Sequence, residues 1–240
     1  TSGNQGIGLA LVGAVKGYKT KIIMPDSVSE ERRLIVEHYG AEVILIHDEG
    51  NIGKAIDECM QTAMRMAKED PNVFVPQQFE NKANPMAHKH HTGLEILEQV
   101  AGPIDGFCSG IGTGGTITGI GETLKAQNPD IIIWAVEPAN AAVLAGGTVS
   151  NHIQMGIGDG VIPPVLNQSI YEEIAIISDE EALNTAKELA SKEGIMCGIS
   201  SGTNVAAAKR LAKYLGKGKT VVTVLPDTAE RYFSTPLFKN

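Results

Sequence analysis

Residues 106–119 read GFCSGIGTGGTITG, a strand pattern that runs through a glycine-rich turn into a helix pattern. A strand-like start at Phe107-Cys108 leads into a turn that holds four glycines, and a helical pattern follows from Thr116. Glycines let the backbone approach an anion closely, and the hydroxyls of Thr113 and Thr116 add donors where a helix dipole favours negative charge. The stretch therefore predicts a strand–turn–helix unit that cradles a phosphate group.

Strand and helix patterns alternate on both sides of this unit. The expected strands are 21–24, 42–46, 73–75, a segment near 106, 131–136, 174–177 and 220–225. The expected helices are 7–15, 29–39, 52–68, 91–100, 116–126, 178–191 and 203–215, with capping boxes at Ser27/Glu30 and Ser178/Glu181. Such alternation predicts an α/β fold with parallel strands, right-handed crossovers and helices on both faces of the sheet.

A polar cluster marks the best internal boundary. Asn81 to Asn84, followed by Pro85, interrupts the alternation after Gln77-Gln78-Phe79. We therefore expect two lobes, each a mostly parallel twisted sheet flanked by helices: a smaller one over residues 1–80 and a larger one over residues 81–240.

Composition excludes several classes of partner. The 240 residues carry 20 Lys and Arg against 28 Asp and Glu, a net charge of -8, which argues against nucleic acid or anionic lipid. No apolar run approaches the ~18 residues of a membrane span. The three cysteines form no CxxC pair, so neither a disulfide framework nor a zinc ribbon is expected, and a reducing cytoplasm fits best.

Two further loops carry small polar residues at the start of a helix. Residues 1–6 read TSGNQG, which fits an anion site at a helix N-terminus as well as it fits a simple N-cap. Residues 198–202 read GISSG, which matches the GxSxG pattern of a hydrolase nucleophile. All six histidines precede Ser200, whereas that class of hydrolase places its histidine after the serine, so the order excludes this function.

The glycine turn also matches a dinucleotide fingerprint. Gly110, Gly112 and Gly115 give GxGxxG, and Glu137 follows near the end of the next strand, where an acid would hold a ribose hydroxyl. A nicotinamide-dependent dehydrogenase is therefore a competing hypothesis. The turn lacks the GK[ST] of a P-loop, which excludes nucleoside triphosphate chemistry.

A histidine cluster suggests a metal, but its spacing is unsuitable. His88, His90 and His91 do not give the i, i+4 pair of helical metal ligands, and no acid or cysteine cluster accompanies them. We expect solvated histidines at a helix start and no metal site.

Four motifs together resemble one family. TSGN, QQF, GTGGT and GISSG, in this order, are similar to those of the cysteine synthase (O-acetylserine sulfhydrylase) family, which are fold-type II enzymes that use pyridoxal phosphate. The resemblance covers essentially the whole chain, including the closing residues 221–238.

The resemblance implies a role for each motif. Gly112, Thr113, Gly114, Gly115 and Thr116 would hold the cofactor phosphate, Asn4 would bond the phenolic oxygen, and Ser200 would face the pyridine nitrogen. Thr1, Ser2, Gly3, Gln5 and Gln78 would clamp the substrate carboxylate, which would pull a mobile smaller lobe onto the larger one.

The implied reaction is β-replacement through an α-aminoacrylate, from O-acetyl-L-serine and sulfide to L-cysteine and acetate. The family's Schiff-base lysine lies upstream of TSGN, so we expect the native protein to have more sequence before Thr1. Asp159 stands in the loop GIGDG (156–160), where the family commonly has a small uncharged residue. It is either a solvent-facing aspartate or a base that activates water or a thiol, which would favour release of hydrogen sulfide from cysteine.

Other readings stay open at this point. A cofactor-free binding module, such as a truncated paralogue, is a third class beside the β-replacement enzyme and the dehydrogenase. The family also implies a homodimer and, in many relatives, binding of the C-terminal peptide of serine acetyltransferase.

Overall fold

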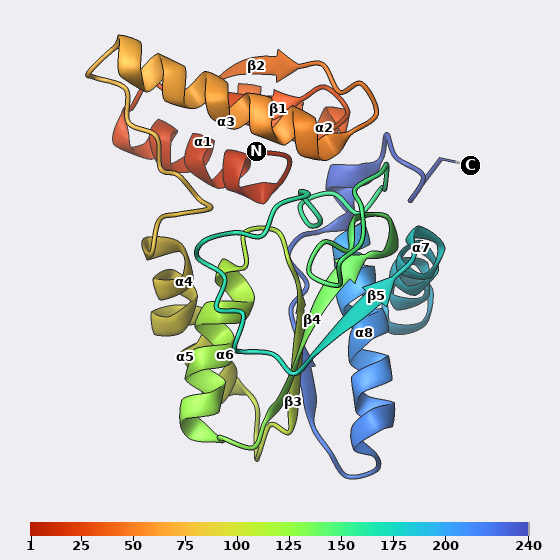
Figure 1. Cartoon of the computed structure of the whole chain (residues 1–240). Coiled ribbons are helices and arrows are strands. Elements are labelled where there is room, and N and C mark those ends of the chain that lie inside the picture. The colour runs from red at the N-terminus through yellow and green to blue at the C-terminus, as the bar shows by residue number, and fades with distance from the viewer. Residues whose placement is uncertain (240) are drawn as a thin grey trace.

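The computed structural model describes residues 1–239 and contains two parallel sheets with helices around them (Figure 1). The α/β class predicted from the alternating pattern is therefore confirmed. The helices α1, α2 and α3 surround a two-stranded sheet, and the remaining helices flank a four-stranded sheet.

The two-stranded sheet lies in the first third of the chain. Parallel strands β1 and β2 pair from Lys21↔Glu42 to Pro25↔Ile46. The elements are α1 (Asn4–Lys16), β1 (Lys21–Pro25), α2 (Glu30–His38), β2 (Glu42–Ile46) and α3 (Ile52–Glu69). A small core of apolar side chains from α1, β1 and α2, including Ile7, Ile22 and Val36, joins them.

The four-stranded sheet has the order β5-β4-β3-β6, and every pair in it is parallel. Its strands are β3 (Gly106–Gly110), β4 (Ile132–Pro138), β5 (Glu173–Ile177) and β6 (Val221–Thr223). Its helices are α4 (Ala83–Ala87), α5 (Gly93–Gln99), α6 (Gly115–Gln127), α7 (Asp179–Glu188) and α8 (Ile199–Leu215). Short helical segments complete it: η1 (His88–Thr92), η2 (Ala139–Ala141), η3 (Leu189–Glu193) and η4 (Ala229–Tyr232).

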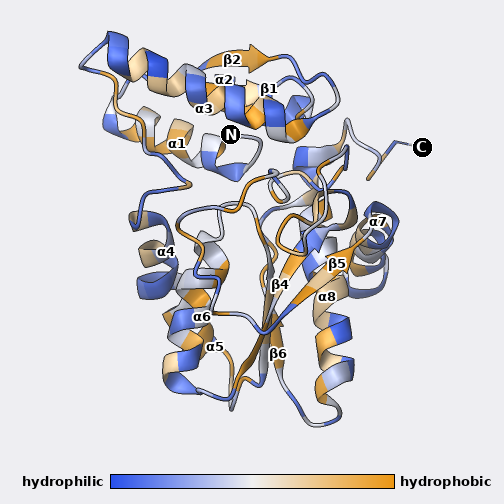
Figure 2. Ribbon diagram, in the orientation of Figure 1, coloured by the Kyte–Doolittle hydropathy of each residue, from blue (hydrophilic) through white to orange (hydrophobic). Residues whose placement is uncertain are grey.

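Each face of this sheet has its own core. Successive strand residues point to opposite faces, so Phe107 and Ile133 pack toward α6, whereas Cys108 and Trp134 pack toward α8. Figure 2 shows the strands as a mostly hydrophobic centre between helices that are hydrophilic on their outer sides. Among residues 1–239, no helix is long and apolar enough to cross a bilayer.

Two predictions of local structure were wrong, and a third missed where a helix begins. Residues 73–75 form no strand. The Ser27 hydroxyl donates to Asp48 Oδ2 at 2.6 Å instead of capping α2, which begins after Ser29. The predicted helix 91–100 is confirmed over residues 91–99, but it is the end of a helical run that starts at Ala83 and includes Pro85, since proline is tolerated in a first turn. The second capping box is confirmed, since Glu181 N donates to Ser178 Oγ.

Candidate active site

A cleft opens at the carboxyl end of β3. Strand β4, which follows β3 in the chain, lies on one side of it, and β6 lies on the other. Ligands of open α/β sheets bind at such a switch point, because the loops after the two neighbouring strands diverge there. The cleft has a volume of about 190 Å³.

Twelve of the predicted site residues line this cleft together. They are Thr1, Ser2, Gly3, Asn4, Gln5, Gln78, Gly112, Thr113, Gly114, Thr116, Asp159 and Ser200. Gly115 does not line it and begins α6 instead. The cleft therefore collects segments that are up to about 200 residues apart in the sequence.

The glycine turn is tightly fitted against its surroundings. Gly114 has a φ of 78°, a left-handed conformation that favours glycine. A Cβ at Gly112 would lie 2.4 Å from the carbonyl oxygen of Gly156. Asn204, on α8, accepts from Gly110 N at 2.7 Å and donates to Val224 O at 2.8 Å. Its side chain therefore joins the turn to the end of β6.

The beginning of α6 is built to receive an anion. The N-cap Gly114 offers no side chain to the first turn. Gly115 N donates to Thr113 Oγ1 at 3.3 Å, and the backbone N–H groups that follow it are available to a ligand. Thr113 Oγ1 accepts from Asn84 Nδ2 at 2.8 Å, and Thr116 Oγ1 lies 3.2 Å from His88 Nε2. These contacts orient both hydroxyls beside the turn.

The interpretation of His88 as a solvated histidine was therefore wrong. Its side chain is partly buried in the wall of the cleft, and burial lowers its pKa, which favours the neutral ring. His90 and His91 are exposed, as expected. Among residues 1–239 no group of three or more His, Cys, Asp or Glu side chains is placed to hold a metal ion.

Asn4 is held by charged groups on the opposite side of the cleft. Its Nδ2 donates to Asp227 Oδ2 at 2.9 Å, and its Oδ1 accepts from Arg231 Nη1 at 2.7 Å. These contacts fix which end of the carboxamide carries the nitrogen. An amide nitrogen has two hydrogens, so one remains for a further acceptor.

Ser2 and Asp159 meet across the cleft. The Ser2 hydroxyl donates to Asp159 Oδ1 at 3.0 Å, and both residues are buried. Burial raises the pKa of Asp159, while the hydrogen bond from Ser2 lowers it. Asp159 is therefore an internal carboxylate and not a solvent-facing one.

Sequence reasoning missed the residues that support the site. Asn84, His88 and Asn204 carry no motif, and their roles arise only from tertiary contacts. Gln78 follows Gln77, whose φ of 52° places a non-glycine residue in the left-handed region. Only the polar cluster after Gln78 signalled an unusual backbone there.

Glu137 has a structural role that the fingerprint did not predict. Its carboxylate accepts from the backbone N–H groups of Leu144 and Ala145, and the side chain is buried away from the cleft lining. It therefore pins the loop that follows β4 and is not placed to hold a ribose. This geometry argues against the dehydrogenase hypothesis.

The cleft fits a phosphorylated aromatic cofactor. The glycine turn lies on one side of the cleft, and a Cβ added at Gly112 would fill the space beside it. The buried Ser200 hydroxyl also lies in the lining, near the start of α8. No lysine of residues 1–239 lines the cleft. Fold and site together define an α/β enzyme that anchors such a cofactor at the carboxyl ends of parallel strands.

Comparison with known proteins identifies the family. Residues 1–227 match the model of the pyridoxal-phosphate dependent enzymes. The chain is 48% identical over 242 residues to a cysteine synthase of Staphylococcus aureus, covering 99% of this chain and 76% of that protein. The chain therefore belongs to the pyridoxal-phosphate dependent enzyme family and uses that cofactor.

Solved structures agree with this assignment. A cysteine synthase of Entamoeba histolytica aligns with a TM-score of 0.90 and 40% identity, over 100% of this chain and 70% of that one. A hydrogen sulfide-producing enzyme of Fusobacterium nucleatum aligns with a TM-score of 0.90 and 40% identity, over 97% and 77%. The resemblance drawn from the four motifs is thus confirmed.

Proposed function

We propose that the protein makes L-cysteine and acetate from O-acetyl-L-serine and sulfide. The observation that carries this proposal is the gathering of the predicted phosphate-binding, ring-binding and carboxylate-binding residues in one cleft. The 48% identity to a protein named cysteine synthase supports the choice of substrate class.

In this proposal, each part of the cleft holds one part of the cofactor. The turn from Gly112 to Thr116 binds the phosphate, and the free N–H of Asn4 donates to the phenolic oxygen. The Ser200 hydroxyl meets the ring nitrogen and, unlike a carboxylate, need not protonate it. Bound pyridoxal phosphate supplies an electron sink that stabilises negative charge at the substrate Cα.

The first loop binds the substrate in the same proposal. Backbone N–H groups and hydroxyls of Thr1, Ser2, Gly3 and Gln5, together with Gln78, receive the carboxylate. Because residues 1–3 lead directly into α1 and Gln5 lies in its first turn, carboxylate binding draws a mobile smaller lobe (residues 1–80) toward the larger one (81–240) and excludes water.

The test is cysteine formation by the native protein. Purified native protein is incubated with O-acetyl-L-serine and sulfide, and cysteine is quantified. Gln78→Ala raises the KM for O-acetyl-L-serine at least about tenfold by removing a carboxylate contact. Gln61→Ala, at an exposed residue of α3 that does not line the cleft, leaves it unchanged. Absence of cysteine formation by native protein that holds the cofactor refutes the proposal.

A second activity, release of hydrogen sulfide from L-cysteine, is favoured by Asp159. A buried carboxylate facing the cleft with a raised pKa is suited to act as a general base. Sulfide release by wild-type protein and by Asp159→Asn is compared with lead acetate or methylene blue detection. Equal rates remove Asp159 from this activity.

The proposal also covers the oligomeric state of the protein, its location and a peptide ligand. We expect a homodimer in the cytoplasm, since relatives of the resembled family are usually homodimers and the cysteines of this chain are free. The C-terminal peptide of serine acetyltransferase is a further candidate ligand of the same cleft. Analytical ultracentrifugation and a peptide titration test the two expectations separately.

A further inference from the structure

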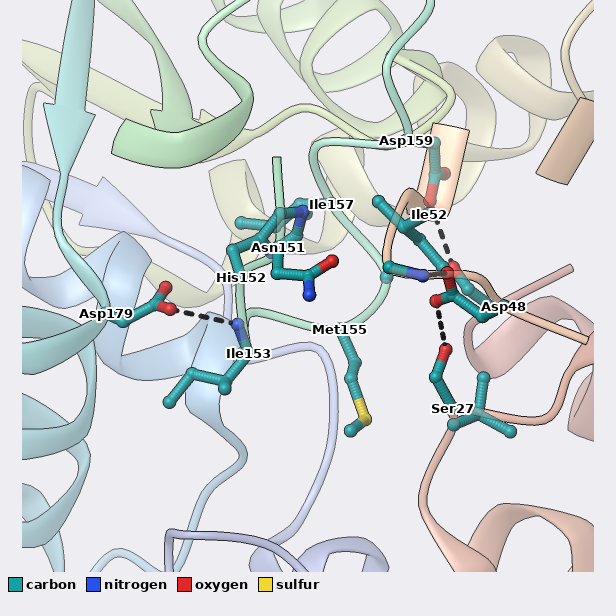
Figure 3. Close-up of a pocket in the computed structure, with 14 residues that line it drawn as sticks. Ser27, Asp48, Ile52, Asn151, His152, Ile153, Met155, Ile157, Asp159 and Asp179 are labelled. Atoms are coloured by element: carbon teal, nitrogen blue, oxygen red, sulfur yellow. Dashed lines mark hydrogen bonds between the residues drawn. The ribbon is translucent and has the colours of Figure 1, made fainter. Parts of the chain in front are cut away.

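Ser2 and Asp159 form a wall between two hollows. Both residues line the cleft described above, and both also line a neighbouring cavity of about 350 Å³. Figure 3 shows that cavity, with Asp159 on one side and Asp179 on the other. The hydrogen bond from Ser2 Oγ to Asp159 Oδ1 joins the loop before α1 to the loop 156–160.

The two oxygens of Asp159 face different groups. Oδ1 accepts from Ser2 at 3.0 Å. A Cβ built on Gly112 would lie 3.8 Å from Oδ2, so Oδ2 lies on the side of the glycine turn. Oδ2 is therefore the oxygen nearer the proposed reaction centre.

The Ser2 hydroxyl has a single hydrogen to donate. A serine O–H can serve one strong acceptor at a time. In the present structure that acceptor is Asp159, whereas the proposed function gives Ser2 a second acceptor, the carboxylate of the amino-acid substrate. The two carboxylates therefore compete for one hydrogen.

Resting on the proposed function, we infer that the Ser2 hydroxyl is a switch that withholds Asp159 as a base until substrate is bound. Without substrate, Ser2 donates to Asp159. When the substrate carboxylate takes this hydrogen bond, Asp159 is released to accept a proton from an attacking water or thiol.

After hydrogen sulfide has left the β-carbon, the O–H or S–H bond of the attacking molecule breaks and its proton moves to Asp159 Oδ2. Its electron pair forms the new bond to the β-carbon, while the π pair of the Cα–Cβ double bond moves to Cα, which takes up a proton. Departure of the product returns the Ser2 hydrogen bond to Asp159, whose proton then passes to solvent.

The charges around Asp159 fit this order of events. Burial raises the pKa of Asp159, while the hydrogen bond from Ser2 and the nearby His152 lower it. Asp48 and Asp179 line the neighbouring cavity and add negative charge on that side. Loss of the hydrogen bond and arrival of a second carboxylate both raise the pKa of Asp159, which makes it a stronger base.

The test compares two pH profiles of sulfide release from L-cysteine by native holoenzyme. The acid limb of the kcat/KM profile reports the pKa of the essential base in the free enzyme, and the acid limb of the kcat profile reports its pKa in the substrate complex. In wild type, the kcat limb lies about one pH unit above the kcat/KM limb. In Ser2→Ala the separation is smaller than in wild type, because only the charge of the substrate carboxylate still shifts the limb, and Ser2→Thr restores the full separation. Coincident limbs in wild type, or a separation in Ser2→Ala as large as in wild type, overturn the inference.

A spectroscopic readout does not depend on turnover. Isotope-edited infrared spectroscopy follows the protonated carboxyl group of Asp159, with Asp159→Asn to assign its band. At fixed pH, addition of L-alanine, which has no β leaving group, increases this band more in wild type than in Ser2→Ala, where only the charge of the added carboxylate acts. An unchanged band in wild type overturns the switch even if the protein releases sulfide. An enzyme that shows the band change but releases no sulfide keeps the switch and refutes the second activity.

Discussion

The buried ion pair between Arg32 and Asp227 provides the sharpest stability prediction. Arg32 Nη2 lies 3.0 Å from Asp227 Oδ2, and the two side chains are 2% and 0% exposed. Asp227 also accepts from Asn4 Nδ2 and from the Tyr232 hydroxyl. The pair thus joins α2 to the segment after β6 and also holds a proposed cofactor ligand.

Asp227→Asn keeps the shape of the side chain and removes its charge. The guanidinium of Arg32 is then buried without a counter-ion, and its Nε already has no hydrogen-bond partner. Breaking a buried pair in this way costs about 3–5 kcal/mol. We therefore expect the free energy of unfolding of the native protein to fall by that amount.

Urea unfolding followed by circular dichroism measures this change, with an exposed pair as the matched control. Lys21 and Glu42 are 47% and 57% exposed, so Glu42→Gln costs less than about 1 kcal/mol. The double variant Arg32→Met with Asp227→Asn is less destabilised than the sum of its single changes, because no unpaired charge remains. If Asp227→Asn costs no more than Glu42→Gln, the assignment of a buried, stabilising pair is wrong.

Three further predictions concern the turn, the thiols and a buried acid. Gly112→Ala pushes the turn away from the carbonyl oxygen of Gly156 and raises the dissociation constant of pyridoxal phosphate at least about tenfold in a fluorescence titration. Burial raises the pKa of Cys59 to about 11 and of Cys108 to about 12, so an aromatic disulfide reagent at neutral pH modifies them only as fast as the protein unfolds. Burial raises the pKa of Glu137 above 4.5, so the folded state binds its proton more readily than the unfolded state does. The stabilisation that this proton uptake gives is present below about pH 4.5 and is lost as pH rises through the folded pKa of Glu137. The difference in free energy of unfolding between wild type and Glu137→Gln, measured by urea unfolding, declines over that pH range. A difference that does not change with pH contradicts the prediction.

The sequence predicted the elements whose signal is local. The glycine turn between Phe107 and Thr116 is indicated by its own residues. The Ser178 cap joins two residues that are three positions apart in the sequence. Parallel pairing followed from the alternation of strands and helices, because such strands need crossover connections. These features require no knowledge of distant partners.

The errors arose where a distant partner decided the outcome. Ser27 has the spacing of a cap, but Asp48 competes for its hydroxyl from the end of β2. His88 has the composition of a surface histidine, yet Thr116 and the wall of the cleft enclose it. Asn204 lies inside a helix and bonds the turn 94 residues away, a contact that no motif records. Long-range hydrogen bonds of this kind are invisible in one sequence.

Roles of individual residues in the cleft stay predictions, and one structure tests the central one. Electron density of the native protein with its cofactor is predicted to place the phosphate ester against residues 112–116 and the ring nitrogen beside the Ser200 hydroxyl. Density for a dinucleotide across that turn, or a ring remote from Ser200, would contradict the account.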